Sequence, residues 1–283
     1  MRMMKISRVG MLANDSPRAI ELALDSARFL SGRVDEIRVE KHLLDGMRAA
    51  DSETASDCLS LAAERDELDL ALVFGGDGTI LRSVAAFDRR EVPIFGVNMG
   101  RMGFLSQVEP KDLLPSLRRL LDGEFEICKR MKLDIMLNGE HLGSALNELL
   151  VQGDKIGKIF RGRLGIGDLG DLMFEGDGII ISTPTGSTGH SLSTGGSVVD
   201  CELDAVVISP LGALTPARPL VISAEKELLI APGDECALAI DGELVAKGNR
   251  GVEIRISRSE SRTTFIIFDS DSFWKKLRQR IGG

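Results

Sequence analysis

A short loop of glycines around one acidic residue is the part of this chain that predicts chemistry most directly. The loop reads Gly75-Gly76-Asp77-Gly78-Thr79; it follows an apolar run over 70–74 and precedes a helical pattern over 79–87. A glycine loop between a strand and a helix presents free backbone N–H groups and the positive end of the helix dipole to an anion. The loop therefore predicts a phosphate-binding site.

Asp77 is unexpected in such a loop, because a carboxylate repels a bound phosphate. Its presence in the loop is explained if it accepts a proton from a substrate hydroxyl or helps to hold Mg²⁺. The loop has neither the lysine of a Walker A loop nor the spacing of the dinucleotide-binding fingerprint. Loop and carboxylate together favour phosphoryl transfer over passive nucleotide binding.

A second segment with potential binding groups follows an apolar strand expected over 178–182. It runs from Thr183 through His190 to Gly196 and is crowded with serines, threonines and glycines. Such a loop offers O–H and N–H donors to ribose and phosphate oxygens. His190 is one of three histidines, and a structural hydrogen bond explains it as readily as catalysis does. Asn147-Glu148, at another expected strand end, is a weak signal by itself.

Composition and charge narrow the classes of function. The chain has 283 residues and a net charge of −8, which disfavours nucleic acid as a partner because binding to a phosphate backbone needs a basic face. No stretch reaches the ~18 apolar residues of a membrane span, so we expect a soluble, cytoplasmic protein without a membrane partner. Four widely spaced cysteines predict reduced thiols rather than a disulfide framework or a metal site. Zinc chemistry and a serine hydrolase are poorly supported, since the sequence shows neither paired histidine ligands nor a Ser-His-Asp order.

The elements that must position these groups follow two patterns. Over the first ~120 residues, strands alternate with helices, which is typical of a Rossmann-like α/β domain with a parallel sheet. The expected strands cover 6–12, 34–39, 70–74 and 93–98, and the expected helices cover 17–32, 52–64, 79–87 and 111–121.

After Gly123 the pattern changes to short strands, which predicts a β-rich, largely antiparallel domain. Asn138-Gly139 and Asp241-Gly242 are strong signals for two-residue hairpin turns. The expected strands cover 125–137, 141–151, 160–166, 172–174, 178–182, 205–209, 227–230, 235–240, 252–256 and 264–268. We therefore expect an α/β domain over 1–123 with the phosphate loop, a β-rich domain over 124–268, and a helix within 269–283 that packs back on the first domain.

Taken together, the motifs resemble the NAD kinase family over most of the chain. The resemblance rests on the phosphate loop, on the turn from Asn98 to Gly103-Phe104-Leu105, on Asn147-Glu148, and on Asp177-Gly178 leading into 183–188. The phosphate loop alone is shared with diacylglycerol-type lipid kinases and, loosely, with phosphofructokinases, whereas the order of all the motifs is much more specific. The resemblance implies an NAD kinase-like fold, with an α/β N-terminal domain and a β-rich domain that binds NAD.

The activity that the resemblance implies is transfer of the γ-phosphoryl group of ATP to the 2′-hydroxyl of the adenosine ribose of NAD, which gives NADP. The resemblance also implies a homodimer or homotetramer. Mg²⁺ or another divalent metal would arrive with the nucleotide, so that no ligand cage is expected in the protein. Inorganic polyphosphate stays open as the donor, because the sequence shows no adenine site for ATP as distinct from NAD.

The resemblance also assigns roles by position. Asp77 would be the base that orients and deprotonates the 2′-hydroxyl, and Phe104 would line the adenosine pocket. Asn147 and Glu148 would bind the adenosine half of NAD. Asp177 would face the nicotinamide end. The residues that would shape the phosphate site are Gly75, Gly76, Gly78, Thr79 and Arg82. The other residues expected to bind NAD are Thr185, Ser187, Thr188 (which would help to hold the adenine), Gly189, His190 and Ser193.

Two departures from the family pattern bear on the acceptor. Gly189-His190 stands where the family usually has Ala-Tyr, and the segment before Arg218-Pro219-Leu220 lacks the usual Pro-His and is a residue short. The preference between NAD and NADH therefore stays open. The alternatives are a kinase of the same superfamily for another polyol or a lipid, and a dinucleotide sensor without turnover. The presence of Asp77 and of Asn147-Glu148 argues against lost catalysis.

Overall fold

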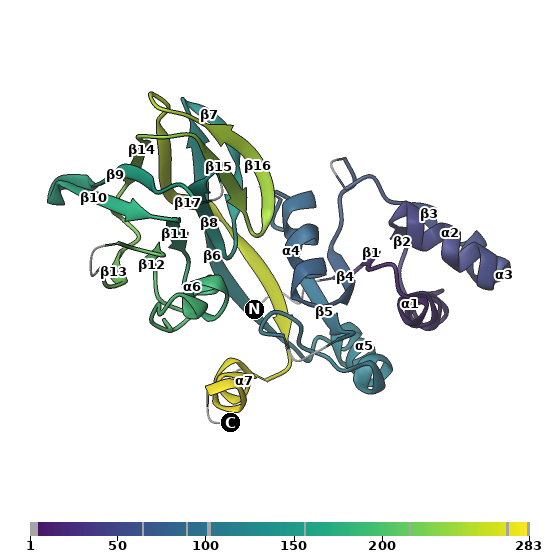
Figure 1. The fold of residues 1–283 in the computed structure, drawn as a ribbon. Helices are drawn as coiled ribbons and strands as arrows, with labels where there is room; N and C mark the ends of the chain where they lie inside the picture. The colour runs from purple at the N-terminus through teal and green to yellow at the C-terminus, as the bar shows by residue number, and fades with distance from the viewer. Residues whose placement is uncertain are drawn as a thin grey trace. The chain divides into compact units, whose positions relative to one another are not determined.

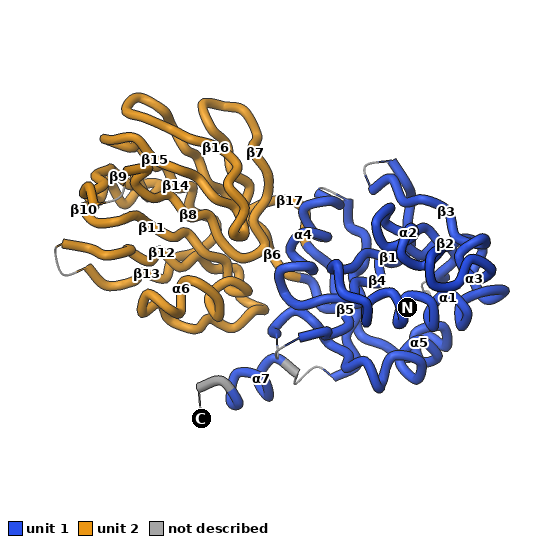
Figure 2. The backbone as a smooth tube through the Cα atoms, turned by 45° about the vertical axis from the view of Figure 1, so that its right-hand side comes forward, with its two compact units in different colours: residues 1–129, 263–283 blue, residues 130–262 orange. Residues whose placement is uncertain are grey.

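The computed structural model describes residues 5–63, 65–88, 90–100, 103–155, 157–214, 217–269 and 272–281. The chain forms two compact units, one of residues 1–129 with 263–283 and the other of residues 130–262 (Figure 2). Two long strands, β6 (Glu126–Leu137) and β17 (Ile254–Ile267), carry the chain from one unit into the other. The functional domains expected over 1–123 and 124–268 stay a prediction.

The first unit is built on a parallel sheet with the strand order β5-β4-β1-β2-β3 and the end of β17 beside β5 (Figure 1). The strands are β1 (Arg8–Ala13), β2 (Glu36–Val39), β3 (Leu59–Ser60), β4 (Leu70–Gly75) and β5 (Ile94–Asn98). Every residue of β4 and β5 is buried, as expected of parallel strands that are covered on both faces. The carboxyl ends of β1, β4 and β5 lie at one edge, where open α/β sheets bind ligands.

The helices of this unit are α1 (Pro17–Leu30), α2 (Lys41–Ala50), α3 (Ser52–Ser56), α4 (Asp77–Ala86), the 3₁₀ turn η1 (Pro110–Asp112), α5 (Leu113–Leu121) and α7 (Ser272–Ile281). α1 begins as the sequence predicts, because the Ser16 hydroxyl accepts the N–H of Ala19 and proline occupies the first helical position. Gly32, just past its end, has φ +69°. Among the described residues, no helix is long and apolar enough to cross a membrane.

The helix predicted over 52–64 is wrong beyond Ser56. The structure ends α3 there and pairs Leu59 with Arg38 of β2 in a short parallel strand. The helix α2, which the sequence analysis did not predict, precedes it. Asp51 separates the two helices, since it ends α2 and its carboxylate accepts the N–H of Thr54 at 3.1 Å to begin α3.

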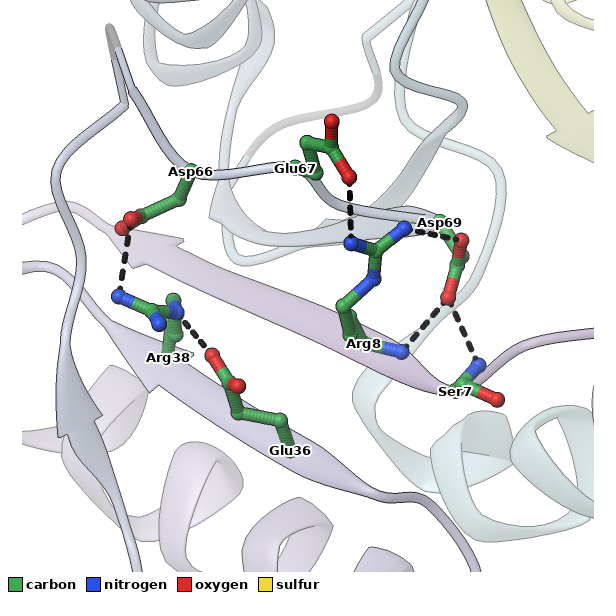
Figure 3. A network of polar contacts seen from close by, with 7 residues as sticks. All are labelled: Ser7, Arg8, Glu36, Arg38, Asp66, Glu67 and Asp69. Carbon is green, nitrogen blue, oxygen red and sulfur yellow. Dashed lines mark hydrogen bonds and ion pairs between the residues drawn. The ribbon is translucent and has the colours of Figure 1, made fainter.

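A polar network fixes the amino-terminal ends of the central strands (Figure 3). Asp69, directly before β4, accepts the backbone N–H groups of Ser7 at 2.9 Å and Arg8 at 2.7 Å. The Arg8 guanidinium also donates to Glu67 at 2.8 Å. These bonds tie the start of β1 to the segment that leads into β4, and so set the register that places the loops at the other edge of the sheet.

The second unit is β-rich and mostly antiparallel, as predicted. One sheet has the strand order β13-β12-β11-β8-β15-β16, and further strands pair in the order β10-β9-β14-β17, while β6 pairs with β7. The bounds are β7 (Glu140–Ala145), β8 (Glu148–Gly153), β9 (Phe160–Ile166), β10 (Asp171–Gly176), β11 (Gly178–Ser182), β12 (Ala205–Leu211), β13 (Leu220–Ser223), β14 (Leu228–Pro232), β15 (Cys236–Ile240) and β16 (Glu243–Gly248), with the 3₁₀ turns η2 (Gly167–Leu169) and η3 (Gly186–Thr188) and the short helix α6 (His190–Ser193). Buried aliphatic side chains from both sets of strands form one core.

Two strand predictions need correction here. The run over 141–151 is two strands, β7 and β8, because the chain leaves the ladder at Leu146 and Asn147. The runs over 252–256 and 264–268 belong to the single long strand β17. Both predicted hairpin turns are confirmed: Asn138 and Asp241 have φ of +51° and +50°, and a glycine with positive φ follows each, as a type I′ turn requires.

Candidate active site

The glycine loop joins β4 to α4 in the first unit, as the sequence predicts (Figure 1). α4 begins at Asp77, and the carbonyl oxygen of Gly76 accepts the N–H of Thr79 at 3.0 Å. The glycines differ in what surrounds them. A Cβ on Gly75 would lie 2.2 Å from the Thr79 hydroxyl, whereas a Cβ on Gly76 or Gly78 would meet no protein atom within 4 Å. Gly75 thus serves the packing of the loop, and the other two leave room beside a helix N-terminus.

The Asp77 carboxylate is held by the backbone of the turn that follows β5. Its Oδ2 accepts the N–H of Phe104 at 2.8 Å, and its Oδ1 accepts the N–H of Leu105 at 3.0 Å. A Cβ on Gly103 would lie only 2.2 Å from Oδ1, so this position needs glycine to admit the carboxylate. Asp77 therefore joins two motifs that lie apart in the sequence, and each of its oxygens keeps lone-pair capacity for one more partner.

The turn that holds Asp77 is itself fixed on both sides. Met99 donates its N–H to the Gly75 carbonyl oxygen at 3.3 Å, which links the end of β5 to the phosphate loop. The Phe104 ring lies 5.9 Å, centroid to centroid, from the ring of Phe273 on α7. The Lys276 ammonium, also on α7, donates to the carbonyl oxygen of Ser106. The C-terminal helix thus packs against the segment that positions Asp77.

Arg82, predicted to bind phosphate, lies on α4. Its guanidinium donates to the carbonyl oxygen of Ala13, at the end of β1, and to the Glu40 carboxylate at 3.2 Å. About half of its side chain is exposed. The structure therefore places Arg82 near the carboxyl ends of β1 and β2 with protein partners of its own, and its contact with phosphate stays a prediction.

In the second unit, the predicted residues Asn147 and Glu148 lie where β8 begins, in a segment that is bonded on both sides. Asp241 accepts the N–H groups of Leu146, Asn147 and Glu148 at 2.8, 2.7 and 3.0 Å. The carbonyl oxygen of Asn147 accepts the N–H of Thr183 at 2.8 Å. The sequence analysis treated Asp241 only as a turn residue; its acidic type in the first position of an Asp-Gly turn is the signal for this second role.

The hydroxyl-rich segment after β11 folds against the same residues. A Cβ on Gly186 would lie 2.2 Å from the Asn147 carbonyl oxygen, so only glycine allows this approach. Ser187 is fully buried; its hydroxyl donates to the Pro184 carbonyl oxygen at 2.6 Å and accepts the N–H of Val199 at 3.0 Å. The Thr188 hydroxyl donates to the carbonyl oxygen of Thr185 at 3.1 Å. The hydroxyls of Ser187 and Thr188 therefore hold the loop in shape.

The remaining predicted residues lie at the surface of this unit. His190 begins α6 and is exposed, and Ser193, at its end, is also exposed. Asp177 is exposed between β10 and β11, where a Cβ on Gly212 would lie 2.2 Å from its carboxylate. The structure thus brings the predicted phosphate residues together in the first unit. In the second unit it brings Asn147 and Glu148 together with the 183–189 loop.

Two of the predicted NAD-binding residues carry buried polar atoms without a hydrogen-bond partner, Oε2 of Glu148 and Oγ1 of Thr185. Native structures leave few buried polar atoms unsatisfied. Both atoms belong to the segments joined at Asn147. A polar ligand bound in this part of the second unit would supply the hydrogen-bond partners that they lack.

The Glu148 side chain is 92% buried, since its exposed fraction is 8%. Burial, and next the negative charge of Asp241, raise the pKa of Glu148 to about 7. Burial also raises the pKa of Asp241, but its three backbone hydrogen bonds act in the opposite direction. Burial is the larger of the two effects, so the pKa of Asp241 is raised overall, while the three amides favour its charged form.

Metal ligands are sparse in the part of the chain that the structure describes, where no group of three or more His, Cys, Asp or Glu side chains could hold a metal ion. The carboxylate at the phosphate loop is Asp77. Mg²⁺ is usually bound by one or two carboxylates together with substrate phosphates and water, and the donor chemistry of Asp77 fits that role.

The raised pKa of Glu148 predicts a pH-dependent stability. The ordinary value is 4.5 and the folded value is about 7, so the folded state binds a proton more tightly between these limits. This contribution to stability is complete below pH 4.5 and is lost as the pH rises to about 7. We expect the difference in free energy of unfolding between the wild type and Glu148→Gln, which cannot ionise, to change by about 3 kcal/mol between pH 5 and pH 8. The variant should become more stable relative to the wild type at the higher pH.

Denaturant unfolding at the two pH values measures this difference. Glu140→Gln, at an exposed position of β7, is the control for the exchange of carboxyl for amide. An unchanged difference between the wild type and Glu148→Gln at both pH values would contradict the raised pKa.

Comparisons with known proteins agree with the geometry. Residues 9–125 match the family model described as the ATP-NAD kinase N-terminal domain, and residues 146–268 match the one described as the ATP-NAD kinase C-terminal domain. The fold is similar to that of yeast NADH kinase complexed with NADH, with a TM-score of 0.91, 21% identity, and coverage of 98% of this chain and 88% of that one. It is also similar to an NAD kinase from Archaeoglobus fulgidus in complex with ATP, with a TM-score of 0.77, 24% identity, and coverage of 96% and 98%. These likenesses confirm the predicted fold class.

Curated relatives are similar over nearly the whole length. The chain is 34% identical over 279 residues to an NAD kinase of Methanothermobacter thermautotrophicus, covering 97% of this chain and 96% of the relative. It is 37% identical over 275 residues to an NAD kinase of Thermococcus kodakarensis, covering 94% and 96%. With both family models matched and relatives of this identity aligned almost end to end, the chain belongs to the NAD kinase family.

Proposed function

We propose that the chain transfers the γ-phosphoryl group of ATP to the 2′-hydroxyl of the adenosine ribose of NAD, with Asp77 as the base. The observation that carries this assignment is the Asp77 carboxylate, fixed at a helix N-terminus by two backbone N–H groups beside glycines that leave open space. A passive phosphate-binding loop has no use for such a carboxylate, whereas transfer to a hydroxyl does.

The transfer forms a bond between the ribose oxygen and the γ-phosphorus and breaks the bond from that phosphorus to the oxygen that leaves with ADP. The hydroxyl proton passes to a free lone pair of Asp77. Gly76 and Gly78 at the start of α4 would present N–H groups to the phosphates, and Thr79, whose N–H donates to the Gly76 carbonyl oxygen, would shape the loop. Since phosphoryl transfer has little proton movement early on, most of the rate enhancement comes from positioning, and the two bonds to Asp77 supply it for the base.

A divalent metal, Mg²⁺ or another ion, would be held by Asp77 and the phosphates of the nucleotide. When bound, it neutralises the charge that develops on the transferred group. ATP is the phosphoryl donor in this proposal. Polyphosphate is the alternative donor, and an assay with each donor alone distinguishes the two.

In the second unit, Asn147, Glu148 and Thr185 would contact the adenosine half of NAD. The buried, unpartnered oxygens of Glu148 and Thr185 support this placement. Ser187 and Thr188 would contribute by holding the loop in shape through their bonded hydroxyls. Gly189, His190 and Ser193 would extend the same surface, and Asp177 would face the nicotinamide end.

We also propose that the chain forms a homodimer or homotetramer and that it acts in the cytoplasm. The edge strands β10 and β13 of the second unit carry exposed apolar side chains, among them Met173 at 74% and Val221 at 50% exposure. Edge strands with apolar surface favour association with a partner, which supports a self-associating chain. Cys58, Cys201 and Cys236 form no disulfide bond, as expected of a reducing compartment.

The test of the function is NADP formation by the purified protein with Mg²⁺ and NAD, in separate reactions with ATP and with polyphosphate. NADP from ATP supports the proposal, and NADP from polyphosphate alone changes the donor. If the protein binds NAD but forms no NADP with either donor, the chain is a sensor or acts on another acceptor.

Asp77→Asn tests the base directly. The amide keeps nearly the same shape but cannot accept the hydroxyl proton, and its NH₂ group would face the N–H of Phe104 or of Leu105. We therefore expect turnover to fall by ~10²-fold or more. NAD affinity, measured by titration calorimetry, should stay within a few-fold of the wild type. Near-normal turnover in this variant would remove Asp77 from its role.

Gly103→Ala tests the positioning of that base. The added Cβ would lie 2.2 Å from Asp77 Oδ1, so the carboxylate must leave its two amide partners, at a cost of about 1–3 kcal/mol in stability. We expect turnover to fall at least ~10-fold. Gly100→Ala is the matched control in the same turn, because its Cβ would meet no atom within 4 Å. Equal activity of the two variants would show that the position of the carboxylate does not matter.

Gly78→Ala separates phosphate binding from folding. A Cβ there meets no protein atom within 4 Å, and alanine is the better helix former by about 0.5–1 kcal/mol. We expect unchanged or slightly higher stability together with a KM for ATP that rises ~10-fold or more, because the methyl group occupies the space of a phosphate. A variant with wild-type KM for ATP would place the phosphates elsewhere.

A further inference from the structure

Asp241 accepts three backbone N–H groups in the second unit, and the proposed chemistry gives it no role. It is the first residue of the turn between β15 and β16, with φ +50°, and Gly242 follows with φ +89°. β15 pairs with β8, with Ile240 opposite Leu149. This register brings the turn beside the start of β8, where the Asp241 N–H donates to the Glu148 carbonyl oxygen at 3.0 Å.

The side chain returns to the same strand. Its Oδ2 accepts the N–H of Leu146 at 2.8 Å, and its Oδ1 accepts those of Asn147 at 2.7 Å and Glu148 at 3.0 Å. These residues lie where the chain has left β7 and begins β8, so the carboxylate takes the place of a neighbouring strand for their N–H groups. Hydrogen bonds to an ionised acceptor are about twice as strong as neutral ones.

The other side of the segment is bonded to the loop after β11. Thr183 donates its N–H to the Asn147 carbonyl oxygen at 2.8 Å and its hydroxyl to the Leu146 carbonyl oxygen at 2.5 Å. With the backbone of 146–148 held on both sides, the directions of the Asn147 and Glu148 side chains are fixed. The buried Oε2 of Glu148, without a partner, is then available to a ligand.

We propose that Asp241 is a positioning residue of the dinucleotide site, which fixes Asn147 and Glu148 for NAD by accepting the N–H groups of 146–148. The inference rests on the proposed function, because it takes NAD as the ligand of Glu148. Asp241 acts through the backbone of its neighbours and needs no contact with NAD itself.

A second consequence concerns the proton on Glu148. The charged groups that act on this pair are the two carboxyls themselves and Lys132 of β6, which opposes the rise in the pKa of Asp241. The negative charge of Asp241 is one cause of the raised pKa of Glu148, and the three amides bonded to Asp241 favour that charge. Removal of the Asp241 charge therefore lowers the pKa of Glu148 and moves the pH dependence of NAD binding to lower pH.

The variant that tests the inference is Asp241→Asn. Its NH₂ group would face one of the backbone N–H groups, donor against donor, so the segment must shift. We expect the Kd and KM for NAD to rise about tenfold or more, with kcat and the KM for ATP changed less than about threefold. The inflection of KM for NAD against pH should move to lower pH.

Asp204→Asn is the matched control. Asp204 lies in the same unit and accepts hydrogen bonds from Arg258 and Arg262 at 2.7 to 2.9 Å, but it bonds to no residue of the 146–148 segment. A merely structural loss would affect both variants alike. If Asp241→Asn does not fold, Asp241→Glu keeps the charge on a longer side chain, and we expect a raised KM for NAD with the inflection retained.

The outcomes separate the two proposals. A wild type that binds NAD without forming NADP overturns the proposed function, and the Kd comparison still decides the role of Asp241. Unchanged NAD affinity in both Asp241 variants, or an Asp204→Asn variant with the same rise in KM and the same shift of the inflection, overturns the inference. A wild type that binds no NAD overturns both.

Discussion

Where a chain leaves a strand or enters a helix, its backbone N–H groups lose their regular partners, and a carboxylate can accept several of them at once. Three aspartates in the described part of the chain form this interaction. Asp77 accepts the N–H groups of residues 104 and 105, and Asp241 accepts those of residues 146–148. Asp69 does the same for residues 7 and 8 at the other edge of the parallel sheet. Two or three consecutive N–H groups bonded to one carboxylate fix both the carboxylate and the backbone that donates to it.

For Asp77 this interaction resolves an apparent conflict. A carboxylate in a phosphate loop repels the ligand, but the same carboxylate holds the turn that carries Phe104 and is held by it. The close approach of Gly103, and the contact of Phe104 with Phe273 of α7, belong to the same arrangement. Asp77 and its support are therefore one structure made from three segments that are distant in the sequence.

The sequence predicted this arrangement only in part. The glycine loop, its strand and its helix follow from apolar patterning and glycine spacing, and both two-residue turns follow from Asn-Gly and Asp-Gly. Local patterns carry such features because only nearby residues determine them. The break at Leu146 and Asn147 was missed, since the run over 141–151 is uninterrupted in the sequence and its interruption depends on Asp241, more than ninety residues away. The helix expected over 52–64 was wrong beyond Ser56 for a similar reason, because Leu59 pairs with β2 and so lies in a strand.

The glycine that departs from the family pattern can be judged by the same geometry. Gly189 has φ −97° and ψ −127°. A Cβ there would lie 3.3 Å from the Gly186 carbonyl oxygen and 3.7 Å from Oε2 of Glu148, which a shift of a few tenths of an ångström would accommodate. Packing thus leaves room for a methyl group, and glycine enlarges the space beside the buried, unpartnered Oε2 of Glu148. If Glu148 binds the acceptor as proposed, a ligand group at this oxygen meets less protein beside Gly189 than it would beside alanine, so the proposed choice among dinucleotide acceptors depends on the surroundings of Glu148.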